Sequence, residues 1–320
     1  MTWNSSGVTT SASYALPTDV LFTQVAAGNG FSYGLTENGE IVAVGTNTFG
    51  QVSGAPTSIG WSAVAAGYDH GLALRNDGTL HAWGRNQYGQ GSVPTDSYAI
   101  ENNLTYTAIA AGEYFNLALR SDGTIFHFGD DSRGKDDIPN NTPGQYVAIA
   151  FGGHHAVAKT AAGRVKAWGG LDYPANECAG SVYTEWTHPG SVPSALSDVA
   201  VLEVGAGHTV TYVITASGRT VYAWGCGLGV QGTPVVLGTP PVGQGYYNVG
   251  VANGVTITGM YGAGLLFTLD STIVQWGRVD ASGTPFSDPP NNIPSELADD
   301  KFIAIGKGHS NLHGVAIRAP

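Results

Sequence analysis

The chain has 320 residues, a formal net charge of −11 at pH 7 and a pI near 5.1, and only 12% of its residues are charged. This balance argues against a nucleic-acid partner, because such proteins need a basic stripe that displaces the counterions of the phosphates. The sequence also lacks the long apolar stretch of a membrane-spanning helix, and residues 1–20 lack the basic start and apolar segment of a signal peptide.

One unit recurs along almost the whole chain and is clearest over residues 61–90, W-S-A-V-A-A-G-Y-D-H-G-L-A-L-R-N-D-G-T-L-H-A-W-G-R-N-Q-Y-G-Q. A glycine ends the first segment of each copy, at Gly28, Gly67, Gly112, Gly152, Gly207, Gly259 and Gly308. These glycines follow one another at intervals of 39, 45, 40, 55, 52 and 49 residues. Repeats of this length are typical of propellers or repeat arrays.

Each unit predicts strands and tight turns. Short runs of Val, Ile, Leu and Thr alternate with small or polar residues, and a turn such as Asn76-Asp77-Gly78 separates the second run from the third. The first five copies occupy residues 25–51, 61–90, 109–129, 149–169 and 204–225. The sixth, over 256–277, has Asp270-Ser271-Thr272 in place of the hairpin glycine, and the seventh begins near Ile305 and holds only two strands. The prediction is an all-β chain.

Two features favour a closed ring of blades. The first strand of a unit ends in small residues, whereas the third carries a large aromatic before glycine, which suits blades that widen away from an axis. Thr2-Trp3-Asn4 resembles a third strand, so residues 1–20 are expected to complete the last blade together with residues 301–320. The fold predicted is a single-domain, seven-bladed β-propeller over residues 1–320.

The unit resembles the repeat of the regulator of chromosome condensation family, whose members fold as seven-bladed β-propellers. The pattern V-A-A-G…H-x-L-A-L…D-G…A-W-G-x-N-x-x-G-Q carries the resemblance, and residues 64–90 match it almost throughout. The family includes guanine nucleotide exchange factors and a plant ultraviolet-B receptor. This chain lacks the basic tail and wedge of the former and the Gly-Trp-Arg-His-Thr segments of the latter. It is most similar to bare bacterial or phage propellers that bind another protein.

The function expected is that of a non-catalytic protein-binding or assembly propeller without cofactor or metal. Low charge with abundant Gly, Thr, Ser and Asn favours a virion or extracellular location, and a decoration or tail-associated bacteriophage protein that contacts other virion proteins is the preferred hypothesis. A secreted bacterial propeller that recognises or inhibits a protein, or a carbohydrate-binding lectin, are the alternatives. No membrane insertion is expected.

The turns after the first and third strands should share one face of the disc. Aromatic side chains on rigid turns provide contact area at little entropic cost, so this face is the predicted binding surface. The candidate partner-binding residues are Tyr68, Asp69, Tyr88, Glu113, Tyr114, His154, His208, His309 and Trp186. Phe31 and Phe115, on the same turns, are expected to be buried. Trp186 lies in an insert over 170–197 that breaks the repeat, and a second irregular stretch covers 278–300.

The histidines, carboxylates and cysteines raise the question of a metal site, a catalytic pair or a disulfide. His155 aligns with His70 as a repeat position, so a metal site at His154-His155 is not expected. Asp69 and Glu113 leave a glycosidase-like carboxylate pair open as an alternative. Cys178 and Cys226 lie in neighbouring units, where they either pair or, as preferred, stay free thiols.

Overall fold

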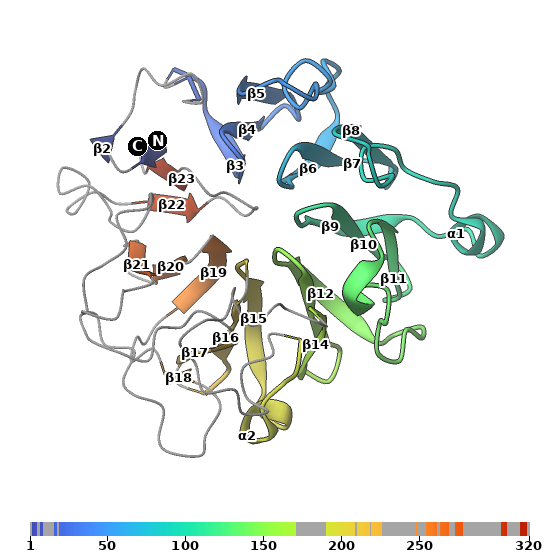
Figure 1. Ribbon diagram of the computed structural model, residues 1–320, viewed down its shortest axis with the longest axis vertical. Coiled ribbons are helices and arrows are strands. Elements are labelled where there is room, and N and C mark those ends of the chain that lie inside the picture. Colours follow the sequence, from blue (N-terminus) through green and yellow to red (C-terminus); the bar gives the residue numbers. More distant parts are fainter. Residues whose placement is uncertain are drawn as a thin grey trace.

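The computed structural model describes residues 2–4, 7–8, 16–17, 19–170, 190–208, 210–217, 219–225, 247–248, 254–260, 263–268, 273–277, 302–305 and 314–318. Antiparallel strands within these residues form seven sheets, which are arranged as blades around a common centre (Figure 1). The first strand of each blade is innermost and the later strands lie progressively further out. The predicted all-β propeller is confirmed.

The strands of the first four blades are β3 (Phe22–Gly28), β4 (Phe31–Thr36) and β5 (Ile41–Gly45); β6 (Trp61–Ala66), β7 (His70–Arg75) and β8 (Leu80–Gly84); β9 (Tyr106–Ala111), β10 (Phe115–Arg120) and β11 (Ile125–Gly129); and β12 (Tyr146–Phe151), β13 (His155–Thr160) and β14 (Val165–Gly169). Blade 5 contains β15 (Val201–Ala206), β16 (Val210–Thr215), β17 (Val221–Gly225) and β18 (Tyr247–Asn248), and blade 6 contains β19 (Gly254–Met260), β20 (Ala263–Thr268) and β21 (Ile273–Gly277). Two short helices, α1 (Ser97–Glu101) and α2 (Ser194–Ser197), lie in the connections.

Blade 7 is built from both ends of the chain. It has the order β2 (Gly7–Val8), β1 (Thr2–Asn4), β23 (Gly314–Arg318) and β22 (Phe302–Ile305). Thr2 pairs with Val315 and Trp3 with Gly314, so the first residues of the chain supply the third strand of this blade. The predicted closure is confirmed, whereas the two-residue strands β2 and β18, which form fourth strands of blades 7 and 5, were not predicted. A single domain over residues 1–320 stays a prediction.

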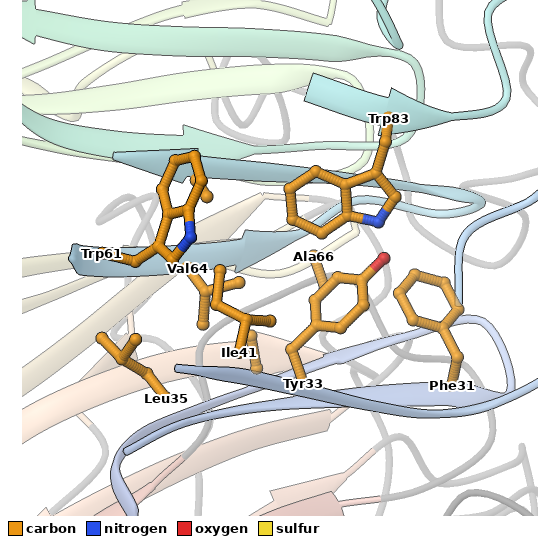
Figure 2. Packing of buried hydrophobic residues seen from close by; sticks show 10 residues of the cluster. Phe31, Tyr33, Leu35, Ile41, Trp61, Val64, Ala66 and Trp83 are labelled. Atoms are coloured by element: carbon orange, nitrogen blue, oxygen red, sulfur yellow. The ribbon is translucent and has the colours of Figure 1, made fainter. Parts of the chain in front are cut away.

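The apolar core lies between neighbouring blades. Between blades 1 and 2, the rings of Tyr33 and Trp83 pack 5.2 Å apart among Phe31, Ile41 and other buried residues (Figure 2). The Tyr33 hydroxyl and the Trp83 indole N–H both donate to the carbonyl of Gln51, at 2.6 and 2.8 Å. The outer-strand tryptophan of one blade is therefore bonded to the connection that leaves the blade before it, which satisfies a polar group inside an apolar cluster.

In blades 1 to 4, the glycine that follows or ends the first strand is required by the contact with the next blade. A Cβ atom on Gly67 would stand 2.6 Å from the carbonyl oxygen of Gly112, the equivalent glycine of the next blade. The same clash with the next blade's glycine carbonyl recurs at Gly28, Gly112 and Gly152, at 2.7, 2.6 and 2.1 Å. Glycine is thus needed for space at the axis, which sharpens the sequence prediction that small residues belong on the innermost strand.

Candidate partner-binding face

The strand order places two sets of turns at the same end of the blades. Turns that link first and second strands include residues 28–31, 67–70 and 112–115, and loops that leave third strands include residues 46–51, 85–90 and 130–135. We call the surface formed by these turns and loops the upper face. The hairpins between second and third strands lie at the opposite end, and we call that end the lower face.

Backbone hydrogen bonds connect the upper turns from blade to blade. The Asn29 N–H donates to the Tyr68 carbonyl at 3.0 Å, and the Tyr68 N–H donates to Gly112 at 3.2 Å. The series continues from Glu113 to Gly153 at 3.4 Å and from Gly153 to His208 at 3.2 Å. Side chains on these turns are therefore carried by a hydrogen-bonded platform that spans blades 1 to 5.

Aromatic residues of three blades meet on this platform around one arginine. The Tyr114 ring lies 6.2 Å from the Tyr68 ring and 5.4 Å from the Tyr88 ring. The Arg85 guanidinium lies over both Phe49 and Tyr114, 4.8 and 5.1 Å from the ring centroids. We call Phe49, Tyr68, Arg85, Tyr88 and Tyr114 the aromatic strip. Burial, with the nearby Glu113 carboxylate, raises the pKa of the Tyr114 hydroxyl to about 12.

Two rings of the aromatic strip are open to solvent. Phe49 is 44% exposed and Tyr88 is 46% exposed, while Tyr68 and Tyr114 are half-buried. The same hydrogen bond fixes both loops. The Gln51 side-chain oxygen accepts a hydrogen bond from the Phe49 N–H, and the Gln90 side-chain oxygen accepts one from the Tyr88 N–H, both at 2.8 Å. The repeated G-Q ending of the unit thus fixes an exposed aromatic side chain above blade 1 and above blade 2.

Asp69 lies beneath this strip. Its side chain is only 8% exposed, and its carboxylate lies 3.2 Å from an Arg85 guanidinium nitrogen. Burial raises the pKa of Asp69, which hydrogen bonds from Arg85 and Asn29 only partly offset. The other side of the guanidinium donates to Gln87 at 2.6 Å. Asp69 therefore positions Arg85 between the aromatic rings.

The third upper loop differs in chemistry. Lys135 replaces the glutamine found at positions 51 and 90, and its buried ammonium lies 2.5 Å from the Asp130 carboxylate. Burial alone would raise the pKa of Asp130, but hydrogen bonds from Lys135 and Ser132 hold that pKa below its ordinary value. A local ion pair thus takes the structural place of a glutamine in this loop.

Three of the predicted residues meet near blades 3 to 5. His154 Nε2 lies 3.0 Å from a Glu113 carboxylate oxygen, and the His154 and His208 rings are 5.2 Å apart. Burial and the neighbouring cationic groups lower the pKa of His154 to about 3 and that of His208 to about 4. Among the described residues, no group of three or more His, Cys, Asp or Glu side chains is placed to hold a metal ion. His309, Trp186, Cys178 and Cys226 lie outside the described residues.

Other predicted positions belong to the scaffold. Phe31 and Phe115 are fully buried, as expected. His70 is buried with Nε2 3.0 Å from the Asn116 side-chain oxygen, and the Asn116 amide donates to the carbonyl of Gln90 at 2.9 Å. Sequence reasoning missed Arg85, the centre of the strip. Its position directly after Trp83-Gly84, at the start of an upper loop, was the available signal.

In the part of the chain that the structure describes, no helix has the length and apolar character needed to cross a bilayer. A ring of antiparallel blades closed by the first strand, with a hydrogen-bonded platform on one face, defines the molecule as a β-propeller.

Residues 22–51, 61–90 and 106–135 each match the regulator of chromosome condensation (RCC1) repeat. The chain thus contains three RCC1 repeats within a β-propeller fold.

Solved structures support this fold. Human WBSCR16 is similar over 96% of this chain and 89% of its own, with a TM-score of 0.68 and 16% identity. Prp20p from Saccharomyces cerevisiae is similar over 92% and 82%, with a TM-score of 0.65 and 17% identity. The ectodomain of the Arabidopsis thaliana receptor kinase ACR4 is similar over 85% and 84%, with a TM-score of 0.56 and 22% identity. No curated protein matches the chain by sequence.

Proposed function

We propose that this propeller is a non-catalytic module that binds another protein through the aromatic strip. The observation that carries the proposal is the pair of exposed rings, Phe49 and Tyr88, whose loops are fixed by side-chain hydrogen bonds and which are linked through Arg85 and Tyr114. Aromatic and arginine side chains dominate protein interfaces, and rings that are already ordered lose little conformational entropy on binding. Arg85 is neutralised by Asp69, so the strip offers contact area without a buried unpaired charge.

Proteins with the same fold provide a parallel. Prp20p of Saccharomyces cerevisiae binds Gsp1p and histones, and it has been crystallised with Kap60 bound. These partners belong to Prp20p. They support the proposal that a propeller of this family recognises another protein, and the aromatic strip supplies a surface for it here.

The finer proposal places the chain on the outside of a bacteriophage particle, as a decoration or tail-associated protein. The composition supports this proposal. Charged residues make up 12% of the chain, half of the roughly 25% found in ordinary soluble domains, and the chain has 47 glycines. Gradient-purified particles should then contain the chain at a fixed copy number per particle. Particles that lack it would reject the virion assignment and leave the binding proposal untouched.

The binding proposal is tested by truncating the exposed rings. Phe49→Ala and Tyr88→Ala should each weaken attachment by about tenfold or more, because an interface residue of this kind contributes on the order of 1.4 kcal/mol or more. The matched controls are Ile59→Ala and Val147→Ala, which remove side chains 67% and 51% exposed at the lower end of the blades. Equal effects of both pairs would refute the assignment. If the chain instead binds one glycan of an array selectively, and Tyr88→Ala abolishes that binding, the partner is a carbohydrate and not a protein.

A further inference from the structure

The outer edges of the blades are completed in different ways. In blade 5, β18 pairs with Tyr222 and Ala223 of β17, and in blade 7, β2 pairs with Trp3 and Asn4 of β1. Both added strands run antiparallel to the third strand and lie at the outside of the ring (Figure 1). These two blades therefore show that a short antiparallel strand fits on the outer edge of a third strand in this molecule.

Blade 3 covers its edge with a side chain. The Ile125 N–H donates to the Asn141 side-chain oxygen at 2.7 Å, and the Asn141 amide donates back to the Ile125 carbonyl at 2.8 Å. This pair of bonds satisfies one backbone unit in the manner of a neighbouring strand. The loop after β11 has thus replaced a fourth strand by one asparagine.

Blade 1 has neither device. The described loop over residues 46–60 contains no strand, and its hydrogen bonds go elsewhere: Thr46 N–H to Gly30, Gly54 N–H to Gly50. Within residues 19–170, no backbone or side-chain group bonds to the outer edge of β5. Alternate N–H and C=O groups of β5 therefore face outward without a partner among the described residues, which is the arrangement that accepts an added strand.

The sequence of β5 is unprotected as well. Exposed edges usually carry lysine, proline or a bulge that discourages pairing, but β5 reads Ile-Val-Ala-Val-Gly, and Val42, Ala43 and Val44 are only half-buried. The third strand of blade 2, β8, reads Leu-His-Ala-Trp-Gly, so it has His81 where β5 has Val42 and is less apolar.

Charge decides the kind of strand that fits. Glu37 and Glu40 are exposed at the hairpin that precedes β5, and neither has an ion-pair partner among the described residues. A strand antiparallel to β5 brings its carboxyl end to this hairpin. We propose that the outer edge of β5 binds an extended, uncharged segment of a partner protein with a lysine or arginine at its carboxyl end, paired opposite Val42 and Ala43. This edge is separate from the aromatic strip.

The test uses the full chain and a synthetic hexapeptide of alternating threonine and valine that ends in lysine. The peptide should slow amide hydrogen exchange in β5, and N-methylation of its valines should lower its affinity about tenfold, because strand addition depends on main-chain bonds. Glu40→Lys should weaken binding, whereas Glu101→Lys on α1 and Tyr88→Ala should not.

The proposal would be overturned by absence of peptide binding, by equal binding of the N-methylated peptide, or by exchange protection confined to another blade. A concentration-dependent dimer in which β5 amides are protected without peptide would overturn it too, since a second copy would then occupy the edge. Because Tyr88→Ala is a control here, failure at β5 is distinguishable from failure of the aromatic strip.

Discussion

Substitution of Gly67 by alanine tests whether the blades are held at their glycines. The new Cβ would stand 2.6 Å from the Gly112 carbonyl oxygen and 2.1 Å from the His70 ring. His70 cannot rotate away without loss of its contact with Asn116, and the Gly112 carbonyl belongs to the backbone of the next blade. Overpacking costs about 1–3 kcal/mol and a buried hydrogen bond contributes about 1 kcal/mol. The expected loss is therefore about 3 kcal/mol.

The loss would be measured by thermal unfolding of the purified chain. For a chain of this length, each kcal/mol corresponds to about 1.5 °C, so the Tm of Gly67→Ala should fall by about 4–5 °C. Gly144→Ala is the matched control: its φ of +78° disfavours alanine, but nothing lies within 4 Å of the added Cβ. The control should cost about 1 kcal/mol. If the two variants melt together, the contact between blades does not require the glycine.

Two further outcomes are expected. Burial lowers the pKa of His70 and His208 from the ordinary 6.5 to about 4, so between these pH values the unfolded chain binds more protons than the folded chain. The Tm should therefore fall as the pH drops from 7 to 4. An unchanged Tm across this range would contradict the burial of these neutral histidines. Lys135→Gln leaves the partly buried Asp130 carboxylate without its cation and should lower the free energy of unfolding by about 1–2 kcal/mol, measured in urea. The double variant Asp130→Thr with Lys135→Gln places at these positions the Thr and Gln that pair as Thr46 and Gln51 in the first loop, and it should recover most of that free energy. No recovery would show that the ion pair does not take the place of that glutamine.

The repeat predicted the architecture because each of its recurring residues meets a local structural requirement. The hairpin glycines Gly39 and Gly78 adopt positive φ, Gly67 makes room for the next blade, and Trp83 bonds to the preceding connection. These requirements recur in most of the blades, so they are visible as a pattern in the sequence. The closure of blade 7 by Thr2-Trp3-Asn4 could be predicted because the seventh unit has only two strands and the chain begins with a third.

The remaining features depend on contacts between segments far apart in sequence. Asp69 was predicted at the surface because it lies in a turn, but Arg85, sixteen residues later, covers it. Similarly, Asp96 caps α1 and pairs with Arg120 at 2.7 Å, and the Asn141 amide stands in for a strand on β11. Each of these contacts occurs once among the described residues, so the repeat gives no signal for it. The strands β2 and β18 are too short to form a periodic pattern.

The most direct test of the aromatic strip is site-specific photocrosslinking in the native source. A photoreactive phenylalanine analogue placed at position 88 should capture one protein partner, and the same analogue at position 59, which is more exposed but lies at the lower end of the blades, should not. Capture of that partner from position 59 and not from position 88 would place the binding surface on the lower face and contradict the account.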